Sequence, residues 1–476
     1  MKPSPYIAII PIILLIGLIS LTVSIFGANS IDGGSQISML FAAACAATLS
    51  MSIYKMPWKI IEQGICKSIG NTSSAIIILL LIGMISGTWM ISGIIPTCIY
   101  YGVQIVSPQM FLVSCCLISA IMSVMTGSSW TTIATIGVAL LGIGHALGIS
   151  SAWAAGAIIS GAYFGDKISP LSDTTVLASS TSEVTLFSHI QYMLLTTIPS
   201  FVLGLIIFLI AGFTSFNDNA VMIDEVTQGL SATFNISGWV MIVPIIVGVM
   251  IVRKVPALIT LLVASILAII ASIIVQPDVL FNIGEGNMVK GIMLTCFGHT
   301  QLDTGSVVLN DLISTNGMSG MLNTIWLILC ALTFGGVMMS TGMIQSITSV
   351  IIKWVRGRVS LVSSTVFTGL LANIVTSDQY LSIIITASMF KGAYKKLGFE
   401  GRLLSRTTED AVTVTSVLIP WNSCGLTQAT ILGVPTIAYM PYCFFNYISP
   451  LMSIFVAIIG WNIKKVTLNQ IQGNHK

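Results

Sequence analysis

Apolar runs of about 20 residues, separated by short polar connections, cover most of the chain. A helix needs about 20 apolar residues to cross the hydrocarbon core of a bilayer, so each run predicts a membrane span. The uninterrupted runs are Ile7 to Gly27, Ile37 to Ile53, Ser74 to Ile95, Ile190 to Phe213, Gly238 to Val252, Pro256 to Val275, Asn323 to Ile344 and Pro441 to Trp461. The pattern predicts an all-α polytopic membrane protein.

Composition agrees with this prediction and excludes other classes of protein. Of the 476 residues, 55% are hydrophobic and 7% are charged, which is far from the composition of a soluble domain. The net charge is only +3 and its basic residues lie in short clusters, so no nucleic-acid surface is expected. The nine cysteines lie mostly in apolar runs without a CxxC pair, which argues against a zinc site and leaves no cofactor to expect.

Lysine and arginine residues between the runs predict the orientation of the chain. Connections on the cytoplasmic side of a membrane are enriched in these residues. The clusters are Lys55 with Lys59 and Lys67, Arg253 with Lys254, Lys353 with Arg356 and Arg358, and Lys464 with Lys465. All of them fall on one side if Lys2 is cytoplasmic. Both termini are therefore predicted to lie inside.

Two longer apolar segments are interrupted in the middle by polar turns. The first, Met110 to His145, is too long for one span, and the second, Ser360 to Tyr394, has basic clusters at both ends. Two short half-helices joined at a polar tip enter and leave a membrane by the same face. Such a hairpin explains both the length of the first segment and the basic clusters at the two ends of the second. The pattern predicts two re-entrant hairpins that open to opposite faces. Their tips are Thr126, Gly127, Ser128 and Ser129 in one, and Thr376, Ser377 and Asp378 in the other.

The hairpins belong to a repeat that spans the chain. Thr376 follows Thr126 by 250 positions, and Gly342 follows Gly93 by 249; Asp410 is paired with Asp166, and Ser416 with Ser172, at a spacing of 244. Each half then contains about five spans and one hairpin, and an odd number of spans inverts the second half. The predicted units are a first repeat at 1–215, a linker at 216–237, a second repeat at 238–463 and a tail at 464–476. Inverted repeats with broken helices are typical of secondary transporters.

The first predicted broken helix contains the sequence GDKISPLSDTT. Pro170 removes a backbone donor near the middle of this helix, so the helix is expected to unwind there. The exposed oxygen atoms suit a hard cation such as Na⁺, with Asp166 and Asp173 as its charged ligands. An ion pair that only closes a kinked helix is the competing interpretation. The neutral ligands are Ser172 and Thr174, and Lys167 is expected to hold Asp166 or Asp173 ionised when no cation is bound.

A second broken helix is predicted from Arg406 to Gly425. Pro420 and Asn422 mark its break, and the hydroxyls of Thr413, Thr415 and Ser416 precede it as further candidate ligands. Glu409 and Asp410 are candidate site or gating carboxylates, with a salt bridge to Arg406 as the alternative for either. Asp378, at the second hairpin tip, is the strongest carboxylate of this half because no lysine adjoins it. Its alternative role is to accept hydrogen bonds from the backbone of the turn.

The motifs GAYFGDKISPLSDTT, TSDQY, RTTEDA and VTSVLIPWNSCG occur in this order and together resemble the NhaC-type sodium/proton antiporter family. The resemblance covers most of the chain. It implies an ion-transporter-superfamily architecture, a location in a bacterial inner membrane and sodium efflux driven by proton entry, with Na⁺ held at Asp166, Ser172, Asp173 and Thr174. By the same resemblance, Asp378 and the strip from Thr413 to Ser416 lie opposite. Some relatives exchange organic anions instead.

Two other functions are weighed against sodium/proton exchange. Sodium-coupled exchange of a small carboxylate of the malate or lactate type is the alternative within transport, with Lys167 or Arg406 as the anion partner. An intramembrane aspartyl protease would use two aspartates, but the residues around Asp166 read FGDK and not GxGD. No Walker A loop is present, so direct ATP drive is not expected. The sequence leaves open whether the chain forms a homodimer.

Overall fold

The computed structural model describes residues 3–26, 33–215, 220–253, 255–302, 310 and 313–463, and these residues form a helical protein. Among them, nine helices are long and apolar enough to cross a membrane, or up to eleven if each of two bent helix pairs is one span. The prediction of a helical multi-pass membrane protein is confirmed. The predicted tail at 464–476, residues 216–219 of the linker, and Lys2 and Lys254 of the orientation signal lie outside the described residues.

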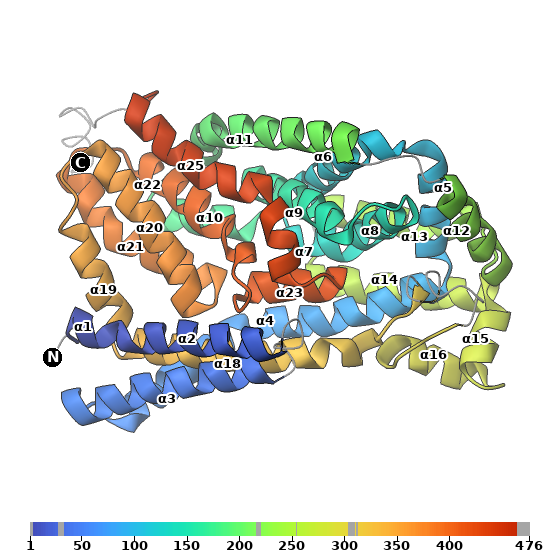
Figure 1. Cartoon of the computed structure of the whole chain (residues 1–476), viewed down its shortest axis with the longest axis horizontal. Helices are drawn as coiled ribbons and strands as arrows, with labels where there is room; N and C mark the ends of the chain where they lie inside the picture. The colour runs from blue at the N-terminus through green and yellow to red at the C-terminus, as the bar shows by residue number, and fades with distance from the viewer. Residues whose placement is uncertain are drawn as a thin grey trace.

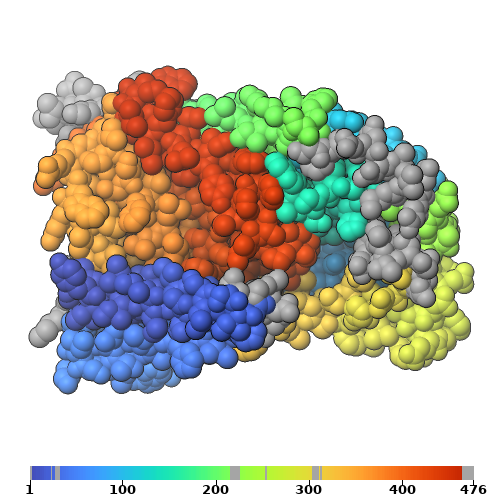
Figure 2. Space-filling model, in the orientation of Figure 1, coloured from blue at the N-terminus to red at the C-terminus, as the bar shows by residue number. Residues whose placement is uncertain are grey.

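A layer of long helices forms one side of the molecule. Its members are α2 (Ile10–Phe26), α3 (Gly34–Tyr54), α4 (Trp58–Ile91) and α18 (Leu322–Ser340), which lie side by side in the lower part of Figure 1. Figure 2 shows the blue N-terminal helices along this edge, with orange and red C-terminal helices above them. Small side chains at Ala42, Ala43 and Ala46 of α3 are buried, so the backbones approach closely.

Helix α4 is longer than the span predicted from Ser74 to Ile95. It begins at Trp58, so Lys59 and Lys67 lie within the helix and not in a connection. The polar residues before Ser74 do not stop it because none of them between positions 58 and 74 is a proline. Thirty-four residues of helix rise about 51 Å at 1.5 Å per residue. This is longer than the ~30 Å apolar core of a bilayer, so the basic end can extend beyond it.

Two helical hairpins form where the sequence predicts them. The first joins α6 (Pro108–Thr126) to α7 (Ser129–Thr132), the π-helical turn η2 (Ile133–Gly137) and α8 (Val138–Ala146), and the second joins α20 (Arg358–Thr376) to α21 (Gln379–Lys396). Their arms contain 18 or 19 residues each and are thus longer than the predicted half-helices. The tips fall at Gly127 and Ser377, which both have left-handed backbone conformations.

Both predicted broken helices are present, and a proline lies in each break. The first consists of α9 (Ser151–Ile168) and α10 (Asp173–Thr181), with Pro170 between them. In the second, Pro420 lies between the last helical turn of the first part and α23. The second comprises α22 (Gly401–Thr408), the π-helical turn η5 (Glu409–Thr413), the 3₁₀ turn η6 (Ser416–Leu418) and α23 (Ser423–Leu432).

The other elements surround the hairpins and the broken helices (Figure 1). A pair bent by 91° joins residues 226–233 of α12 to η3 and α13, and a pair bent by 56° joins α24 and η7 to α25. Their bounds are α1 (Pro5–Ala8), α5 (Ile94–Ile105), α11 (Leu186–Ser215), α12 (Ala220–Thr233), η3 (Gly238–Met241), α13 (Ile242–Val252), α14 (Ala257–Val275), α15 (Pro277–Ile283), α16 (Met288–Phe297), η4 (Gly317–Met321), α19 (Met343–Ile352), α24 (Thr436–Tyr439), η7 (Met440–Tyr442) and α25 (Phe444–Ile459).

The first hairpin packs closely against the first broken helix. Gly161 and Gly165 are four residues apart on α9 and face α6. A Cβ atom at Gly161 would lie 2.1 Å from the carbonyl oxygen of Cys116, and one at Gly165 would lie 2.4 Å from that of Ala120. Small residues at this spacing let two membrane helices approach until their backbones touch. The approach holds the hairpin tip beside the break that follows Ile168.

Candidate functional site

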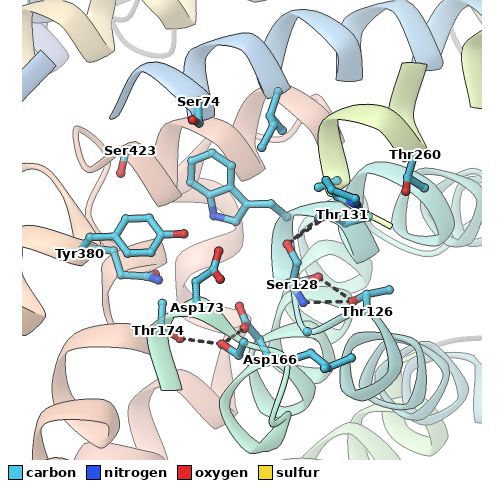
Figure 3. Close-up of a pocket in the computed structure, with 18 of the residues that line it drawn as sticks. Ser74, Thr126, Ser128, Thr131, Asp166, Asp173, Thr174, Thr260, Tyr380 and Ser423 are labelled. Atoms are coloured by element: carbon cyan, nitrogen blue, oxygen red, sulfur yellow. Dashed lines mark hydrogen bonds between the residues drawn. The ribbon is translucent and has the colours of Figure 1, made fainter. Parts of the chain in front are cut away.

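A cavity of about 590 Å³ lies where the two hairpin tips meet the first break. Its walls come from both tips, from the break between α9 and α10, from α4 and from the start of α14 (Figure 3). Its polar lining residues are Asn71, Thr72, Ser74, Thr126, Ser128, Thr131, Asp166, Ser172, Asp173, Thr174, Thr260, Asp378, Gln379, Tyr380 and Ser423, and Trp130 adds an aromatic face. The segments with the strongest sequence signals thus surround one space.

Three carboxylates, those of Asp166, Asp173 and Asp378, line the cavity. Among the described residues that line it, no lysine, arginine or histidine accompanies them. Negative charges that surround a partly enclosed space focus a negative potential on it, which attracts cations and repels anions. Carboxylate and hydroxyl oxygens are the ligands that Na⁺ and other hard cations prefer. The cavity therefore has the chemistry of a cation site.

Asp166 ends the first part of the broken helix and connects it to the first hairpin tip. Its Oδ2 accepts hydrogen bonds from the Ser129 backbone N–H at 3.0 Å and from the Ser129 hydroxyl at 2.7 Å. Its Oδ1 accepts a hydrogen bond from the Ser172 hydroxyl at 2.6 Å. The carboxylate is only 5% exposed, so these donors replace the water that it loses on burial.

Asp173 and Tyr380 face the cavity from different elements. Asp173 is the first residue of α10, and its side chain is exposed to the cavity. Figure 3 shows its carboxylate in the space between Tyr380 and the first hairpin. The N-terminal end of a helix carries a partial positive charge, which stabilises a carboxylate at this position. Asp173 thus offers a free carboxylate, while that of Asp166 is held by its donors.

Asp378 caps a helix of the second hairpin and also lines the cavity. It is the N-cap of α21, and its Oδ1 accepts a hydrogen bond from the Leu381 backbone N–H at 2.9 Å. Its Oδ2 accepts a hydrogen bond from the Thr72 hydroxyl at 3.4 Å, and the residue lines the cavity. The side chain therefore stabilises the hairpin and also places a charge at the site.

The two hairpin tips have the same hydrogen-bond pattern at a spacing of 250 residues. The Thr126 hydroxyl donates to the Ser128 carbonyl at 3.1 Å, and the Thr376 hydroxyl donates to the Asp378 carbonyl at 2.9 Å. The backbone N–H of Ser128 and that of Asp378 each donate in return to the same threonine. Gly127 is required in the first tip because its φ is +67° and a Cβ would lie 2.6 Å from Leu171.

Contacts between hairpin and broken helix also recur at this spacing. Ser123 donates to the Ala162 carbonyl at 2.6 Å, and Asn373, 250 positions later, donates to the Val412 carbonyl at 2.7 Å. The contact of Ser129 with Asp166 corresponds to one in which the Ser416 hydroxyl donates to Gln379 Oε1 at 2.8 Å. The prolines of the two breaks have the same spacing. At this spacing the position that corresponds to Asp166 is Ser416, whereas the spacing of 244 pairs Asp166 with Asp410.

The hydroxyl strip of the second half lies away from the cavity. Thr413, Thr415 and Ser416 are buried, and none of them is among the residues that line the space. Thr415 accepts a hydrogen bond from the Asn373 amide at 3.1 Å, and Ser416 reaches the lining only through Gln379. The second half contributes its hairpin tip, Ser423 and the start of α14 to the cavity.

A buried ionic cluster lies beside the cavity. The Lys167 ammonium forms an ion pair with the Asp410 carboxylate and donates to the Ser449 hydroxyl at 2.8 Å. Arg406 lies on the other side of Asp410, with 3.8 Å between its Nε and Asp410 Oδ2, and its guanidinium is 4.7 Å from the centre of the Tyr192 ring. The expected contact of Lys167 with Asp166 or Asp173 is replaced by this pair. Adjacent residues of a helix point about 100° apart, so Asp166 and Lys167 face different sides.

Several residues of the site have only weak signals in the sequence. Asn71, Thr72 and Ser74 belong to the polar stretch GNTSS, residues 70–74, which interrupts the apolar pattern of α4. All three residues line the cavity. Thr196 on α11 and Ser449 on α25 both hydrogen-bond Asp410, at 3.1 and 3.3 Å. Isolated hydroxyls in apolar runs are common in membrane helices, so the pattern does not single out these two.

The protein has many membrane-spanning helices and a carboxylate-lined cavity between two hairpin tips and a broken helix. This combination of features defines a secondary transporter of cations. Comparison with known proteins agrees and is more specific. A sequence model of the Na⁺/H⁺ antiporter family matches residues 161–461. This is more than half of the chain, and the chain belongs to this family.

The matches to known relatives extend over most of each relative and most of this chain. The Na⁺/H⁺ antiporter NhaC of Alkalihalophilus pseudofirmus is 37% identical over 411 residues, which are 86% of this chain and 87% of the relative. NhaC of Bacillus subtilis is 35% identical over 424 residues, or 88% of this chain and 91% of the relative. The malate-2H⁺/Na⁺-lactate antiporter of Bacillus subtilis is 34% identical over 416 residues, or 86% and 87%. The resemblance found in the motifs is confirmed.

Proposed function

We propose that this chain is a secondary antiporter that exchanges Na⁺ for H⁺ across the bacterial inner membrane by alternating access. The observation that carries the proposal is the cavity in which three carboxylates meet without a basic side chain in its described lining. The family and the two NhaC relatives support the choice of ions. The relatives are named as transporters, and we propose no enzymatic activity.

Competition for the same oxygen atoms would couple the two ions. Asp166 and Asp173 provide the charged ligands for Na⁺, and Ser172 and Thr174 provide hydroxyl oxygens beside them. A bound cation stabilises the ionised carboxylates, while a proton on either one removes a ligand charge. The site thus holds Na⁺ or protons in alternation, and a change of exposure between the two loadings produces exchange. Asp378 adds a third charge from the opposite hairpin.

Inverted repeats would provide the change of exposure. The repeated hydrogen bonds at a spacing of 250 support two equivalent halves, one at 1–215 and the other at 238–463. In such transporters each half gates the site from one face of the membrane. The basic clusters support cytoplasmic termini, since Lys59 and Lys67 lie in the N-terminal part of α4 and Arg253 precedes α14, and both helices lead to the cavity. We propose that the hairpins are the gates.

Proteoliposomes test this function directly. Purified protein is reconstituted with a pH-sensitive dye inside, and Na⁺ is added outside. We expect Na⁺-dependent proton movement in the wild type and a loss of roughly 100-fold in Asp173→Asn, because a free site carboxylate becomes neutral. A matched control is Asp278→Asn, which changes an exposed aspartate in the first turn of α15. An inactive wild type, or a fully active Asp173→Asn protein, contradicts the proposal.

Exchange of small carboxylates is the second candidate, and the relative named as a malate-2H⁺/Na⁺-lactate antiporter favours it. The geometry offers this function less support. Lys167 and Arg406, the predicted anion partners, are fully buried and face Asp410, and neither lines the cavity. Uptake of labelled malate or lactate that depends on Na⁺ would establish this candidate. We expect no such uptake above that of protein-free liposomes.

A further inference from the structure

A second cavity, of about 450 Å³, lies next to the cation cavity along the same segments of the chain. On α4, Ile78 lines the first cavity and Ile82, one helical turn later, lines the second. The second arm of the first hairpin and α23 repeat this order, since each begins at the first cavity and continues to the second. The lining residues are Trp130 and then Ala134 in the hairpin, and Ser423 and then Thr430 in α23. The two cavities therefore follow one another along a common track through the protein.

These cavities lie toward opposite ends of the helices that they share. Ser151, the first residue of α9, lines the second cavity, while Asp166, near the other end of this helix, lines the first. The first cavity also reaches Pro256, in the connection that contains the basic residue Arg253, and the second reaches Gly433, just after α23. With the orientation proposed above, the first cavity faces the cytoplasm and the second faces the other side of the membrane.

The lining of the second cavity is polar and contains, among the described residues, no carboxylate, lysine or arginine. Hydroxyl and amide groups reach it from Ser86, Asn316 and Thr430, and His145 adds an imidazole. An ion path needs sites that attract the ion enough for it to enter and that hold it weakly enough for it to leave. The three carboxylates of the first cavity attract a cation, whereas neutral hydroxyls let a hydrated cation pass. The two cavities thus have the chemistry of a binding site and of its outlet.

Two buried polar side chains without hydrogen-bond partners lie between the cavities. Gln428 is placed between Ser423 and Thr430 on α23 and is fully buried, yet neither its amide oxygen nor its amide nitrogen has a partner among the described residues. Tyr163 on α9 is also fully buried, and its hydroxyl, which lies near Cys424 and Gln428, has no partner there either. Buried polar groups in a stable arrangement are nearly always hydrogen-bonded. These two residues therefore indicate a second arrangement, in which water or an ion fills the vacant positions.

Both halves of the chain contribute to the barrier between the cavities. The Cys424 thiol donates to Gln379 Oε1 at 2.9 Å, and Gln379 lines the first cavity, so the polar group begins at the wall of the cation site. On the side of the first hairpin the barrier is formed by η2, which packs against α23. Turns of π-helix are rare and frequently occur at functional sites. We call η2 together with Tyr163, Cys424 and Gln428 the closure.

We propose that the second cavity is the extracytoplasmic half of the ion path, and that Gln428 and Tyr163 are the polar residues that Na⁺ or its hydration water contacts when the closure opens. The proposal rests on the proposed function and adds two residues outside the cation site to it. Opening would separate the first hairpin from α23, so that the vacant hydrogen-bonding positions of Gln428 and Tyr163 face the path. With the closure shut, the ion reaches only the first cavity.

Cysteine labelling in sealed vesicles tests the path without any measurement of proton movement. Ser74 and Ser86 both lie on α4 and line the first and the second cavity, respectively, and each is replaced by cysteine in turn. A membrane-impermeant maleimide is added to right-side-out and to inside-out vesicles, and the labelled residue is identified by mass spectrometry. We expect Ser86→Cys to react roughly tenfold faster from the outside and Ser74→Cys roughly tenfold faster from the inside, because each cavity opens to one face. Labelling of both from the same side, or no labelling of Ser86→Cys in a protein that still exchanges Na⁺, overturns the proposal.

Substitutions in the closure test the role of its polar groups. Gln428→Leu keeps a side chain of similar size but offers no hydrogen bond to water or to an ion. We expect ²²Na⁺/Na⁺ exchange in proteoliposomes to fall by roughly tenfold, since a hydrogen-bonding group on the path is lost. Na⁺ should still raise the midpoint of thermal unfolding, because the first cavity keeps its carboxylates. Tyr163→Phe, which removes only a hydroxyl, should also slow exchange.

Gln345→Leu, on the exposed surface of α19, is the matched control and should exchange Na⁺ at the wild-type rate. Full exchange by both Gln428→Leu and Tyr163→Phe would overturn the assignment of these residues. A Gln428→Leu protein whose unfolding midpoint no longer responds to Na⁺ would place Gln428 in the cation site and overturn it as well.

The outcomes also separate this proposal from the function on which it rests, since labelling does not depend on which ion is exchanged for Na⁺. A protein that is labelled from opposite sides but shows no Na⁺-dependent proton movement overturns the antiport function alone. A protein with that movement whose two cysteines react from the same side overturns the path alone.

Discussion

Lys167 forms an ion pair with Asp410, 243 positions later in the chain, and both side chains are completely buried. The contact joins the end of α9 to the π-helical turn that begins the second break. Thr196 and Ser449 hydrogen-bond the same carboxylate oxygen from two further helices. The pair therefore fixes the two broken helices to each other beside the cation cavity. We expect its loss to lower the stability of the folded protein more than its affinity for ions.

The first prediction concerns that pair. Asp410→Asn leaves the Lys167 charge buried without its partner, and removing one member of a buried pair costs about 3 to 5 kcal/mol. We expect the apparent midpoint of thermal unfolding in detergent to fall by several degrees. The double variant Lys167→Met/Asp410→Asn should be more stable than either single variant. Glu285→Gln, which breaks the exposed Glu285–Lys290 pair, is the control and should leave the midpoint unchanged. Additive losses in the double variant would contradict a coupled pair.

The second prediction separates the two roles of Asp378. Asparagine caps a helix about as well as aspartate, so Asp378→Asn should keep the hydrogen bond to the Leu381 backbone and alter stability by less than about 0.5 kcal/mol. It removes the charge from the cavity, so we expect Na⁺-driven proton movement to fall by roughly tenfold. Asp378→Ala removes both and should lower stability as well. Full transport by Asp378→Asn would leave only the capping role.

A third prediction follows from the contact between α6 and α9. Gly161→Ala places a methyl group where the carbonyl oxygen of Cys116 lies 2.1 Å away, so the helices must separate. Overpacking of this kind costs about 1 to 3 kcal/mol. The shift also moves Ser129 from Asp166, and we expect reduced Na⁺ affinity in a binding assay. Gly248→Ala on α13 is the control because no atom lies within 4 Å of its Cβ position. Equal stability of the two variants would contradict the close packing.

The fourth prediction concerns pH. Glu183, in the turn between α10 and α11, pairs with Lys391 and Lys395 of α21, and these lysines hold the pKa of its carboxyl group below the ordinary value of 4.5. A lowered pKa means that the pair stabilises the folded protein above the ordinary pKa, and that this stabilisation disappears as the pH falls through the lowered pKa. The contribution of the pair to the stability of the folded protein is therefore constant from neutral to alkaline pH. Glu183→Gln should leave the pH of half-maximal transport unchanged; a shift in that pH would assign Glu183 a role in activation.

Much of the architecture can be predicted from the sequence because apolar length and polar interruption are local properties. The turns TGSSWTT and TSDQY predict the hairpin tips, and Pro170 and Pro420 predict the two breaks. The start of α4 is missed because charged residues at the end of a long helix look like a connection. The layer made by α2, α3, α4 and α18 cannot be read from the sequence either, since it depends on which helices pack together.

The partners of individual charges are harder to predict than the elements that carry them. Lys167 follows Asp166 directly, and proximity in the chain suggests a contact that helical rotation prevents. Pairing Asp166 with Asp410 matches one carboxylate with another. The hydrogen bonds and the two prolines, however, recur at a spacing of 250 residues. Side-chain chemistry differs between these segments, while the contacts that involve the backbone recur. Geometry is thus the better guide to equivalent positions.

The spacing of 250 residues has a consequence for how charge is divided between the two proposed halves. The three cavity carboxylates, Asp166, Asp173 and Asp378, each have a serine at the corresponding position of the other half, namely Ser416, Ser423 and Ser128. In none of these three pairs do both positions hold an acid. Two acids in one pair would place like charges on both sides of the proposed symmetry axis. Under the proposed repeat the charge of the site is therefore asymmetric, because the first half contributes two of the three acids and the second half contributes one.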